Sequence, residues 1–155
     1  MSYVMEGSIW PDNPVPTATK QLIARLLEIG DTDTPDSGEK MAQEIFTHDG
    51  VLDHCTYRFE GREAISKCRS GPKPPGNRIT KSRHHISRVY SQTGKVDDLM
   101  LIGERVVEFE KGQTVNNMFA ARAVVDESTP GTSPRLSLFT IYIASQALFI
   151  CHISR

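Results

Sequence analysis

Four segments in the second half of the chain have the residue pattern of β-strands: Arg83–Tyr90, Leu99–Phe109, Val115–Val125 and Leu136–Ala144. The last three are rich in Val, Ile, Leu and Phe with single polar residues interleaved, which favours strands over helices. Only Glu110-Lys111-Gly112-Gln113 separates the second strand from the third, which is typical of a β-hairpin. The pattern predicts one curved antiparallel sheet.

The first half shows helical spacing instead. A helix is predicted from Thr17 to Ile29, with Thr17 as its N-cap and Gly30 as its stop signal. Asp36-Ser37-Gly38-Glu39 resembles a capping box, so a second, short helix is predicted from there to about Phe46. Two helices therefore come before the first strand.

The middle of the chain predicts one more strand and one more helix. His48-Asp49-Gly50 has the composition of a turn, and Val51–Phe59 is predicted to be a strand that is bent or broken near His54. Gly61–Arg69 is predicted to be a third short helix. The fold class is therefore α+β, with helices closing the concave face of a curved sheet, and such a closed face forms a small-molecule pocket.

Two long connections join these elements. Ser70–Ser82 contains two glycines, three prolines and three basic residues, a length and composition found both in functional lids and in plain mobile loops. Asp126–Pro134 is similarly polar and is interpreted as a surface excursion. The predicted organisation is an N-terminal extension (1–16), one cone-shaped domain (17–145) and a C-terminal tail (146–155).

The charge balance excludes several classes of partner. The 155 residues include 18 basic and 19 acidic side chains, so the formal net charge is -1. Such a chain lacks the positive excess that drives binding to nucleic acid or to a membrane surface. It also has no apolar run long enough to span a membrane and no leader pattern at its start, so a soluble, cytoplasmic protein is expected.

The cysteines do not predict a metal site. Cys55, Cys68 and Cys151 are scattered, without the Cys/His pairing that structural zinc needs, and we interpret them as reduced structural residues. A nucleophilic cysteine paired with a histidine is the alternative, although no local signature supports it. No cofactor motif is present either, so neither a metal nor a cofactor is expected.

The predicted order of elements resembles the nuclear-transport-factor-two-like superfamily of cone-shaped folds, including its SnoaL-like cyclases and scytalone-dehydratase-like enzymes. The resemblance covers roughly Thr17 to Ala144. Its local motifs are Phe59-Glu60-Gly61-Arg62-Glu63-Ala64-Ile65, similar to the family's F-x-G-x-x-A-I, then Arg83-His84-His85-Ile86-Ser87, similar to its H-x-I strand, and Leu99-Met100-Leu101-Ile102-Gly103, similar to the next strand. The superfamily includes dehydratases, isomerases, cyclases and plain binding or dimerisation modules.

Side-chain alternation divides the predicted hairpin into two faces. With Lys111-Gly112 as a two-residue turn, Gly103 lies opposite Ala120, and Arg105 lies opposite Met118. The first face then holds Leu99, Leu101, Gly103, Arg105, Val107, Phe109, Asn116, Met118, Ala120, Arg122 and Val124. The second face holds Met100, Ile102, Glu104, Val106, Glu108, Asn117, Phe119, Ala121, Ala123 and Val125.

The resemblance implies that the first face lines the pocket. In scytalone-dehydratase-like enzymes the histidine of the H-x-I strand points into the pocket and acts in acid–base chemistry, and the matching residue here is His84, with His85 pointing away. Gly103, Arg105 and Val107 would then also point inward. The chain departs from the dehydratase pattern because it has an arginine at position 105 and no second histidine on that strand, so that family's own mechanism of dehydration is not implied.

His84 and Arg105 are the predicted catalytic residues. A histidine can remove and return a proton near neutral pH, and an arginine in an apolar cavity can stabilise an enolate or bind a carboxylate. Arg122, Asn116 and Tyr57 are the predicted substrate-binding residues. The structural alternatives are a core or strand-edge histidine at position 84 and arginine ion pairs with Glu104, Glu108 or Asp126. A competing register would instead turn His85, Glu104 and Asn117 inward.

The predicted function is that of a cofactor-independent isomerase, lyase or cyclase acting on a hydrophobic oxygenated small molecule, such as a polyketide or terpenoid intermediate of secondary metabolism. The alternative is a non-catalytic ligand-binding or dimerisation module of the same fold, whose cavity would be apolar throughout. A homodimer is expected through the second face, because Met100, Ile102, Phe119 and Ala121 would otherwise face water.

Overall fold

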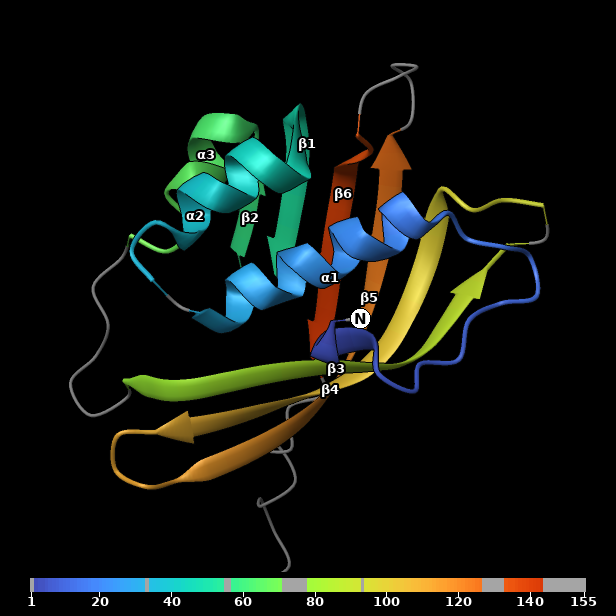
Figure 1. Ribbon diagram of the computed structural model, residues 1–155. Coiled ribbons are helices and arrows are strands. Elements are labelled where there is room, and N and C mark those ends of the chain that lie inside the picture. The colour runs from blue at the N-terminus through green and yellow to red at the C-terminus, as the bar shows by residue number, and fades with distance from the viewer. Residues whose placement is uncertain are drawn as a thin grey trace, which may run out of the picture.

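The computed structural model describes residues 2–32, 34–54, 57–70, 78–92, 94–126 and 133–143. Its helical elements, of which only α1 is longer than five residues, all come from the first half of the chain, and most of its strands come from the second half (Figure 1). In chain order they are η1 (Tyr3–Met5), α1 (Thr17–Thr32), α2 (Ser37–Lys40), η2 (Met41–Ile45), β1 (Phe46–His54), β2 (Tyr57–Glu60), α3 (Arg62–Ser66), β3 (Ile79–Ser91), β4 (Asp98–Phe109), β5 (Thr114–Asp126) and β6 (Arg135–Ile143).

The strands form one six-stranded sheet in the order β2-β1-β6-β5-β4-β3. β3, β4, β5 and β6 pair antiparallel with their neighbours in sequence, as predicted for the second half of the chain. β1, which the prediction left unpaired, pairs parallel with β6, so the complete six-stranded sheet is mixed. The fold class is α+β, and β3, β4 and β5 bend strongly along their length (Figure 1).

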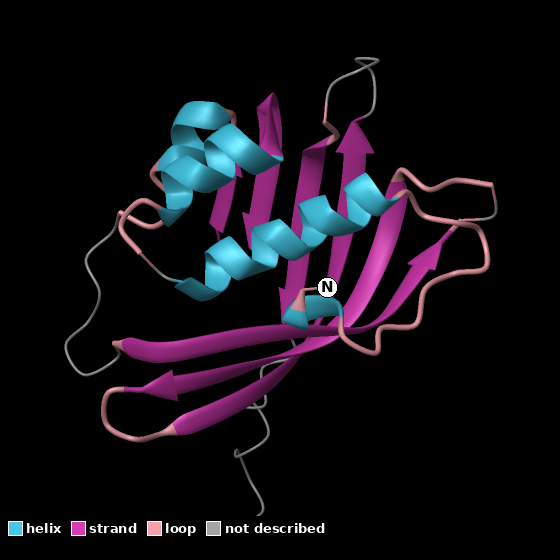
Figure 2. Ribbon diagram, viewed as in Figure 1, coloured by secondary structure: helices cyan, strands magenta, loops and turns pink. Residues whose placement is uncertain are grey.

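The helices lie on the concave face of the sheet (Figure 2). α1 crosses this face, and its apolar side chains, including the fully buried Ile23, join the main core with Phe46 and Phe139 from the sheet. The burial of these side chains supplies the main stabilisation, since each large apolar residue contributes about 1.5–3 kcal/mol when it leaves water. Between α1, α3 and the sheet the packing leaves a cavity, described below.

α1 extends further than the sequence indicates. The predicted stop at Gly30 is wrong, because Gly30 keeps a negative φ and the helix continues through Asp31 to Thr32. The hydroxyl of Thr32 donates a hydrogen bond to the carbonyl of Ile29. The additional turn places Asp31 at the concave face.

The predicted second helix is real but consists of two short pieces. α2 passes directly into the π-helical turn η2, and β1 begins at Phe46, where the prediction still had helix. The predicted turn at His48-Asp49-Gly50 is wrong, because these residues lie inside β1, where the register with β6 is irregular. Gly50 fits this irregularity, since an added Cβ would lie 3.0 Å from the Cβ of Phe46.

The predicted strand Val51–Phe59 is two strands. β1 ends at His54, β2 begins at Tyr57, and the two pair antiparallel with His54 opposite Tyr57, so the predicted break near His54 is confirmed. The third helix is shorter than predicted, because α3 covers Arg62–Ser66 and a turn follows it. Gly61 precedes α3 with φ +81°, a conformation that favours glycine.

The two long connections fall largely outside the described residues. Of the predicted lid Ser70–Ser82, residues 71–77 are outside the description, and Ile79–Ser82 belong to β3. Residues 127–132 of the second connection, Ala144 and the tail 146–155 also lie outside it. The predicted lid therefore stays a prediction.

The hairpin of β4 and β5 has a different register from the predicted one. Its loop has three residues, Glu110, Lys111 and Gly112, because the amide of Phe109 donates to the carbonyl of Gln113 at 2.8 Å. Gly112 has φ +80°, as expected for the last residue of this loop type. The additional residue shifts every pair by one, so Gly103 lies opposite Phe119.

This shift exchanges the two faces of β5. Phe119, Ala121 and Ala123 are buried on the concave side together with Leu101 and Gly103 of β4, so the predicted first face is right for β4 and wrong for β5. The prediction that Phe119 and Ala121 belong to the dimer face is therefore wrong. The Phe119 ring packs directly against Gly103, since an added Cβ would lie 2.7 Å from its Cζ.

The first residues of the chain pack along β3. Val4 of η1 is fully buried and Val15 is 5% exposed. Ile9 forms a parallel bridge with β3, in which its amide donates to Ser87 and its carbonyl accepts from Val89. This segment protects the otherwise open edge of β3.

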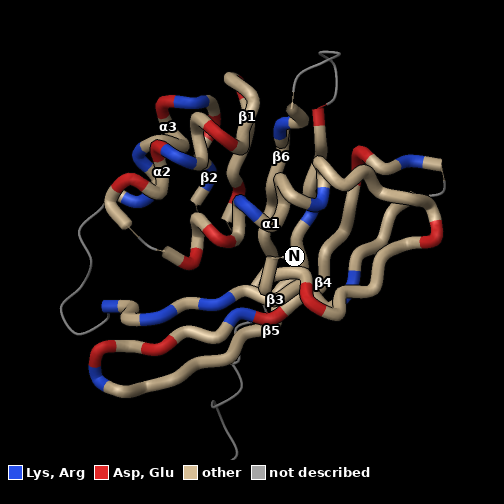
Figure 3. Tube along the Cα trace, viewed as in Figure 1, with Lys and Arg blue, Asp and Glu red and all other residues tan. Residues whose placement is uncertain are grey.

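Basic and acidic positions are interspersed over the described chain rather than gathered by sign (Figure 3), in keeping with the net charge of -1. Among the described residues, no helix is long and apolar enough to cross a membrane.

Candidate functional site

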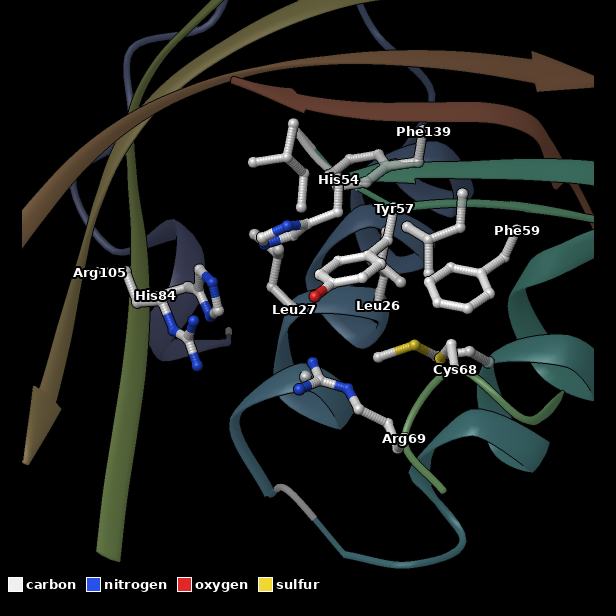
Figure 4. A pocket seen from close by; sticks show the side chains of 14 residues that line it. Leu26, Leu27, His54, Tyr57, Phe59, Cys68, Arg69, His84, Arg105 and Phe139 are labelled. Carbon is white, nitrogen blue, oxygen red and sulfur yellow. The ribbon is translucent and has the colours of Figure 1, made fainter. Parts of the chain in front are cut away.

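A cavity of about 230 Å³ lies between the concave face of the sheet, α1 and the end of α3. Most of its wall is apolar, and the polar side chains gather on the side nearest β3 and β4 (Figure 4). A smaller recess of about 30 Å³ continues it toward Asn117, Phe119 and Ile143. The main cavity is lined by Leu26, Leu27, Gly30, Met41, Leu52, His54, Tyr57, Phe59, Cys68, Arg69, His84, Arg105, Phe139 and Ile141.

His84 is held at the polar end by two contacts. Its Nδ1 lies 2.6 Å from Oδ1 of Asp31, and the edge of its ring packs against Phe119, with centroids 5.7 Å apart and an interplanar angle of 77°. Because Asp31 is a carboxylate, Nδ1 carries the proton and donates it, which leaves Nε2 as the nitrogen that can accept a proton from a ligand. The side chains of His84 and Asp31 are only 11% and 5% exposed.

Asp31 accepts hydrogen bonds on both carboxylate oxygens. Oδ1 receives Nδ1–H of His84 and the hydroxyl of Ser82, whereas Oδ2 receives the backbone N–H of His84 and the hydroxyl of Tyr3. Burial raises the pKa of Asp31, but the hydrogen bonds and charge of His84 and the hydroxyl of Ser82 outweigh it and lower the value to about 2. Asp31 is therefore ionised, although it lies in the last turn of α1, where the helix dipole disfavours a negative charge.

Arg105 joins the same network from β4. It is the direct cross-strand partner of His84, and its Nε donates to the hydroxyl of Ser82 at 3.0 Å. Ser82 in turn donates to Asp31 at 2.8 Å. One serine therefore connects the guanidinium to the carboxylate that orients His84.

Three further polar side chains surround this group. Figure 4 shows the Tyr57 hydroxyl and the Arg69 guanidinium pointing toward the side of the cavity where His84 and Arg105 lie. His54 lies at the end of β1, and burial lowers its pKa, with the positive charges of Arg105 and Arg69 acting in the same direction. His54 is thus a neutral imidazole at neutral pH, able to donate or accept one hydrogen bond.

Cys68 lines the cavity as a half-buried free thiol. Burial raises its pKa, which keeps it protonated and weakly nucleophilic. Cys55 and Cys151 lie outside the described residues. In the described part of the chain, no group of three or more His, Cys, Asp or Glu side chains is arranged to hold a metal ion.

The structure places three of the predicted site residues in the cavity and two elsewhere. His84, Arg105 and Tyr57 line it, and their roles stay predictions. Arg122 and Asn116 lie on the outer face of β5, because the true hairpin register turns them away from the concave side. Arg122 forms a bidentate ion pair with Asp98, and Asn116 donates to Glu104, so their placement in the pocket is corrected.

Sequence reasoning missed Asp31 and His54. Asp31 lies four residues after Leu27, which lines the cavity, so the helical period places both on one side of α1 if the helix is continued past Gly30. His54 had a weaker signal, as the last residue before a strand break. Asn117, one residue from the predicted Asn116, lines the inner recess.

The chain has a cone-shaped α+β fold with a ligand-sized cavity in its concave face. This is the fold of the nuclear-transport-factor-2-like proteins. The structure of nuclear transport factor 2 from Cryptosporidium parvum matches with a TM-score of 0.58 at 15% identity, covering 85% of this chain and 98% of that chain. No family model and no curated protein matches the chain in sequence.

Two further solved structures share the fold. A protein from Jannaschia sp. CCS1 described as a SnoaL-like polyketide cyclase matches with a TM-score of 0.62 at 12% identity, covering 89% of this chain and 93% of that chain. A protein from Novosphingobium aromaticivorans DSM 12444 described as a scytalone dehydratase matches with a TM-score of 0.60 at 14% identity and covers 83% of both chains. At such identities the likeness shows the fold alone.

Proposed function

We propose that this protein catalyses a cofactor-independent proton transfer in a hydrophobic oxygenated small molecule, leading to isomerisation, elimination or cyclisation. The observation that carries the proposal is the Asp31–His84 pair beside Arg105 at the polar end of an apolar cavity. A non-catalytic binding module would need only the apolar wall of the cavity to hold its ligand. Converging ionisable groups inside a cavity are the feature that distinguishes an enzyme from a binding module.

The geometry supports a simple sequence of steps. Nε2 of His84 removes a proton from the carbon next to a substrate carbonyl, and the C–H electron pair becomes the double bond of an enolate. The guanidinium of Arg105 stabilises the charge that develops on the oxygen. Asp31 stabilises the imidazolium and holds the ring in place, as an orienting carboxylate does in other acid–base sites.

The fate of the enolate decides the type of reaction. If the imidazolium of His84 returns its proton to another carbon, the double bond moves and the reaction is an isomerisation. If the enolate expels a group from the β-carbon, the reaction is an elimination, and if it attacks an internal carbonyl carbon, the reaction is a cyclisation. Two of the proteins with this fold are described as a cyclase and a dehydratase, which supports this range of chemistry.

Cavity size limits the ligand. An apolar cavity of about 150 Å³ holds benzene, so a cavity of about 230 Å³ suits a molecule of one or two rings. The apolar wall, with Leu52, Phe59 and Phe139 among its residues, would hold the hydrocarbon part. Fragments of polyketide or terpenoid character meet both conditions.

The proposal is tested by the exchange of solvent deuterium into monocyclic and bicyclic ketones, including β-hydroxy ketones, because exchange requires only the first proton removal. The wild-type protein is expected to accelerate deuterium uptake at the carbon next to the carbonyl, measured by mass spectrometry. The Arg105→Gln variant should be much slower, whereas Arg122→Gln, on the outer face, should match the wild type. Ketones that bind in calorimetry without any accelerated exchange would instead support the binding module.

A further inference from the structure

Tyr3 contacts the candidate catalytic pair from outside the cavity. Its hydroxyl donates a hydrogen bond to Oδ2 of Asp31 at 2.8 Å, although the two residues come from different elements, η1 and the last turn of α1. Asp31 uses its other oxygen to accept Nδ1–H of His84. Tyr3 and His84 therefore share one carboxylate, each on its own oxygen.

The N-terminal segment holds Tyr3 firmly in this position. Ser2 caps η1 by accepting the amide of Val4 at 3.2 Å, and its hydroxyl donates to Glu28 of α1 at 2.5 Å. Val4 is fully buried, and Ile9 is bonded to β3 through its backbone on both sides. The residues before and after Tyr3 are thus both anchored, Ser2 to α1 and Val4 and Ile9 to the core and β3.

The packing of the Tyr3 ring does not depend on its hydroxyl. The guanidinium of Arg83 lies 4.6 Å from the ring centroid, and the half-buried ring packs against the core. A phenylalanine would keep both contacts. The hydroxyl therefore contributes its hydrogen bond to Asp31 and little else in the described part of the structure.

We propose that Tyr3 is a positioning residue of the Asp31–His84 pair, which fixes the carboxylate and moderates its pull on the histidine proton. Its effect on catalysis rests on the proposed function, whereas its effect on the pair does not. Tyr3 lies in the predicted N-terminal extension, outside the predicted domain, and no sequence motif marks it as part of the site.

The physical basis is the sharing of one negative charge. A donor on Oδ2 draws electron density away from Oδ1, which weakens the attraction between Oδ1 and Nδ1–H of His84. Tyr3 remains a donor across the working pH range, because burial raises its pKa, and the hydrogen bond and charge of Asp31 raise it further. Among the described residues, other charged or titratable groups near the assembly include Glu6, Glu28 and Arg83 near Tyr3, and His54, Arg69 and Arg105 near His84.

Proton NMR of the protein without ligand tests the proposal directly. The proton between His84 Nδ1 and Asp31 Oδ1, held in a 2.6 Å contact, should give a resonance far downfield of the backbone amides that is absent in the His84→Asn variant. The Tyr3→Phe variant should shift this resonance further downfield, because Asp31 then concentrates its charge on the histidine. A more acidic, fluorinated tyrosine at position 3 should shift it upfield.

The matched control is Tyr90→Phe. Tyr90 also lies beside an arginine, with Arg88 6.0 Å from its ring centroid, but it is half-exposed on the outer face of β3. This variant should leave the resonance in place. An unchanged resonance in folded Tyr3→Phe overturns the proposal, as does an equal shift in Tyr90→Phe, and the fluorinated tyrosine decides the question if Tyr3→Phe does not fold.

Kinetics provide the second readout once a ketone substrate is found. Loss of the Tyr3 hydroxyl should lower kcat about tenfold and should move the acidic limb of the pH–rate profile, because the charge distribution of the Asp31–His84 pair is altered. KM should change little, because the shape of the cavity stays the same. An unchanged kcat and profile would overturn the catalytic consequence. A shifted resonance without turnover of any ketone would retain Tyr3 as a positioning residue and reject the proposed function instead.

Discussion

His84 and Arg105 are directly opposed across β3 and β4, with both side chains at the polar end of the cavity. Their placement follows from alternation along two adjacent strands, which puts cross-strand partners on the same face. The proposed base and the proposed anion-binding group thus lie side by side on regular β-strands rather than on loops. Rigid placement of this kind is what acid–base catalysis requires of its first contacts.

The first prediction concerns His84. In the His84→Asn variant the side-chain amide can still donate to Asp31, but no basic nitrogen remains, so proton transfer should fall by roughly 10²- to 10⁴-fold while the fold survives. Deuterium uptake and circular dichroism measure the two effects. His85→Asn, the adjacent position facing the other side of the sheet, should retain the wild-type rate. Retained exchange in His84→Asn would remove this residue as the base.

The second prediction concerns acid stability. The pKa of Asp31 is lowered from 3.8 to about 2 in the folded protein, so the unfolded chain binds its proton first as the pH falls. The stabilisation from this group, about 2 kcal/mol in the free energy of unfolding, is complete above pH 4 and lost as the pH approaches 2.

Urea unfolding at a series of pH values measures this effect. Between about pH 4 and pH 2 the wild-type protein should lose about 2 kcal/mol more than the Asp31→Asn variant, which has no carboxylate to titrate. Glu110→Gln at the exposed hairpin loop is the control and should follow the wild-type curve. Parallel curves for the wild type and Asp31→Asn would contradict the lowered pKa.

The third prediction separates stability from binding at Gly30. An added Cβ would lie 3.7 Å from an Arg69 nitrogen and 3.9 Å from Cε1 of His84, so Gly30→Ala fits without overlap. Alanine should raise the free energy of unfolding by about 0.5–1 kcal/mol, since glycine is a poor helix former. The methyl group would also project into the cavity, so thermal unfolding should improve while ketone affinity falls in calorimetry.

Gly103→Ala is the matched comparison. There the added Cβ would overlap the carbonyl of His85 and approach the Phe119 ring, so the free energy of unfolding should fall by about 1–3 kcal/mol. If the two glycine variants changed stability in the same direction, the assignment of open space at Gly30 and closed space at Gly103 would be wrong.

The fourth prediction is the homodimer. Met100, Met118 and Tyr142 are exposed on the outer face of the sheet, at 38%, 50% and 55%. Asp98 and Arg122 neutralise each other on the same face, so charge does not oppose the approach of a second copy. Light scattering at micromolar concentration should give the mass of a dimer, and Met118→Lys should give a monomer. A wild-type monomer under these conditions would contradict the prediction.

The sequence predicts the strands of the second half well because their apolar runs are long. β4 and β5 differ from the predicted ranges by one residue at their ends. The passage from η2 into β1 is predicted less well, since the five residues of η2 and the polar first half of β1 carry too little periodicity to outweigh local turn chemistry. The parallel pairing of β1 with β6 joins segments far apart in sequence, and no local pattern encodes it.

The candidate site shows the same limit. His84 and Arg105 follow from alternation within strands, so the sequence could place them on one face. Asp31 was missed because glycine is a common helix stop, whereas α1 continues through Gly30 to Thr32. Arg122 and Asn116 were misplaced because the length of one hairpin loop decides which face they join.

That loop also has a meaning for how the protein can evolve. An insertion of one residue between Gln113 and Asn116, with the loop and its flanking pair kept, would leave every residue that lines the cavity unchanged in the gene, yet it would turn the rest of β5 over. Met118 would then replace Phe119 beside Gly103, and Asn116 would take the position of Asn117. The spacing between this loop and the cavity residues therefore matters to the cavity as much as the residues themselves.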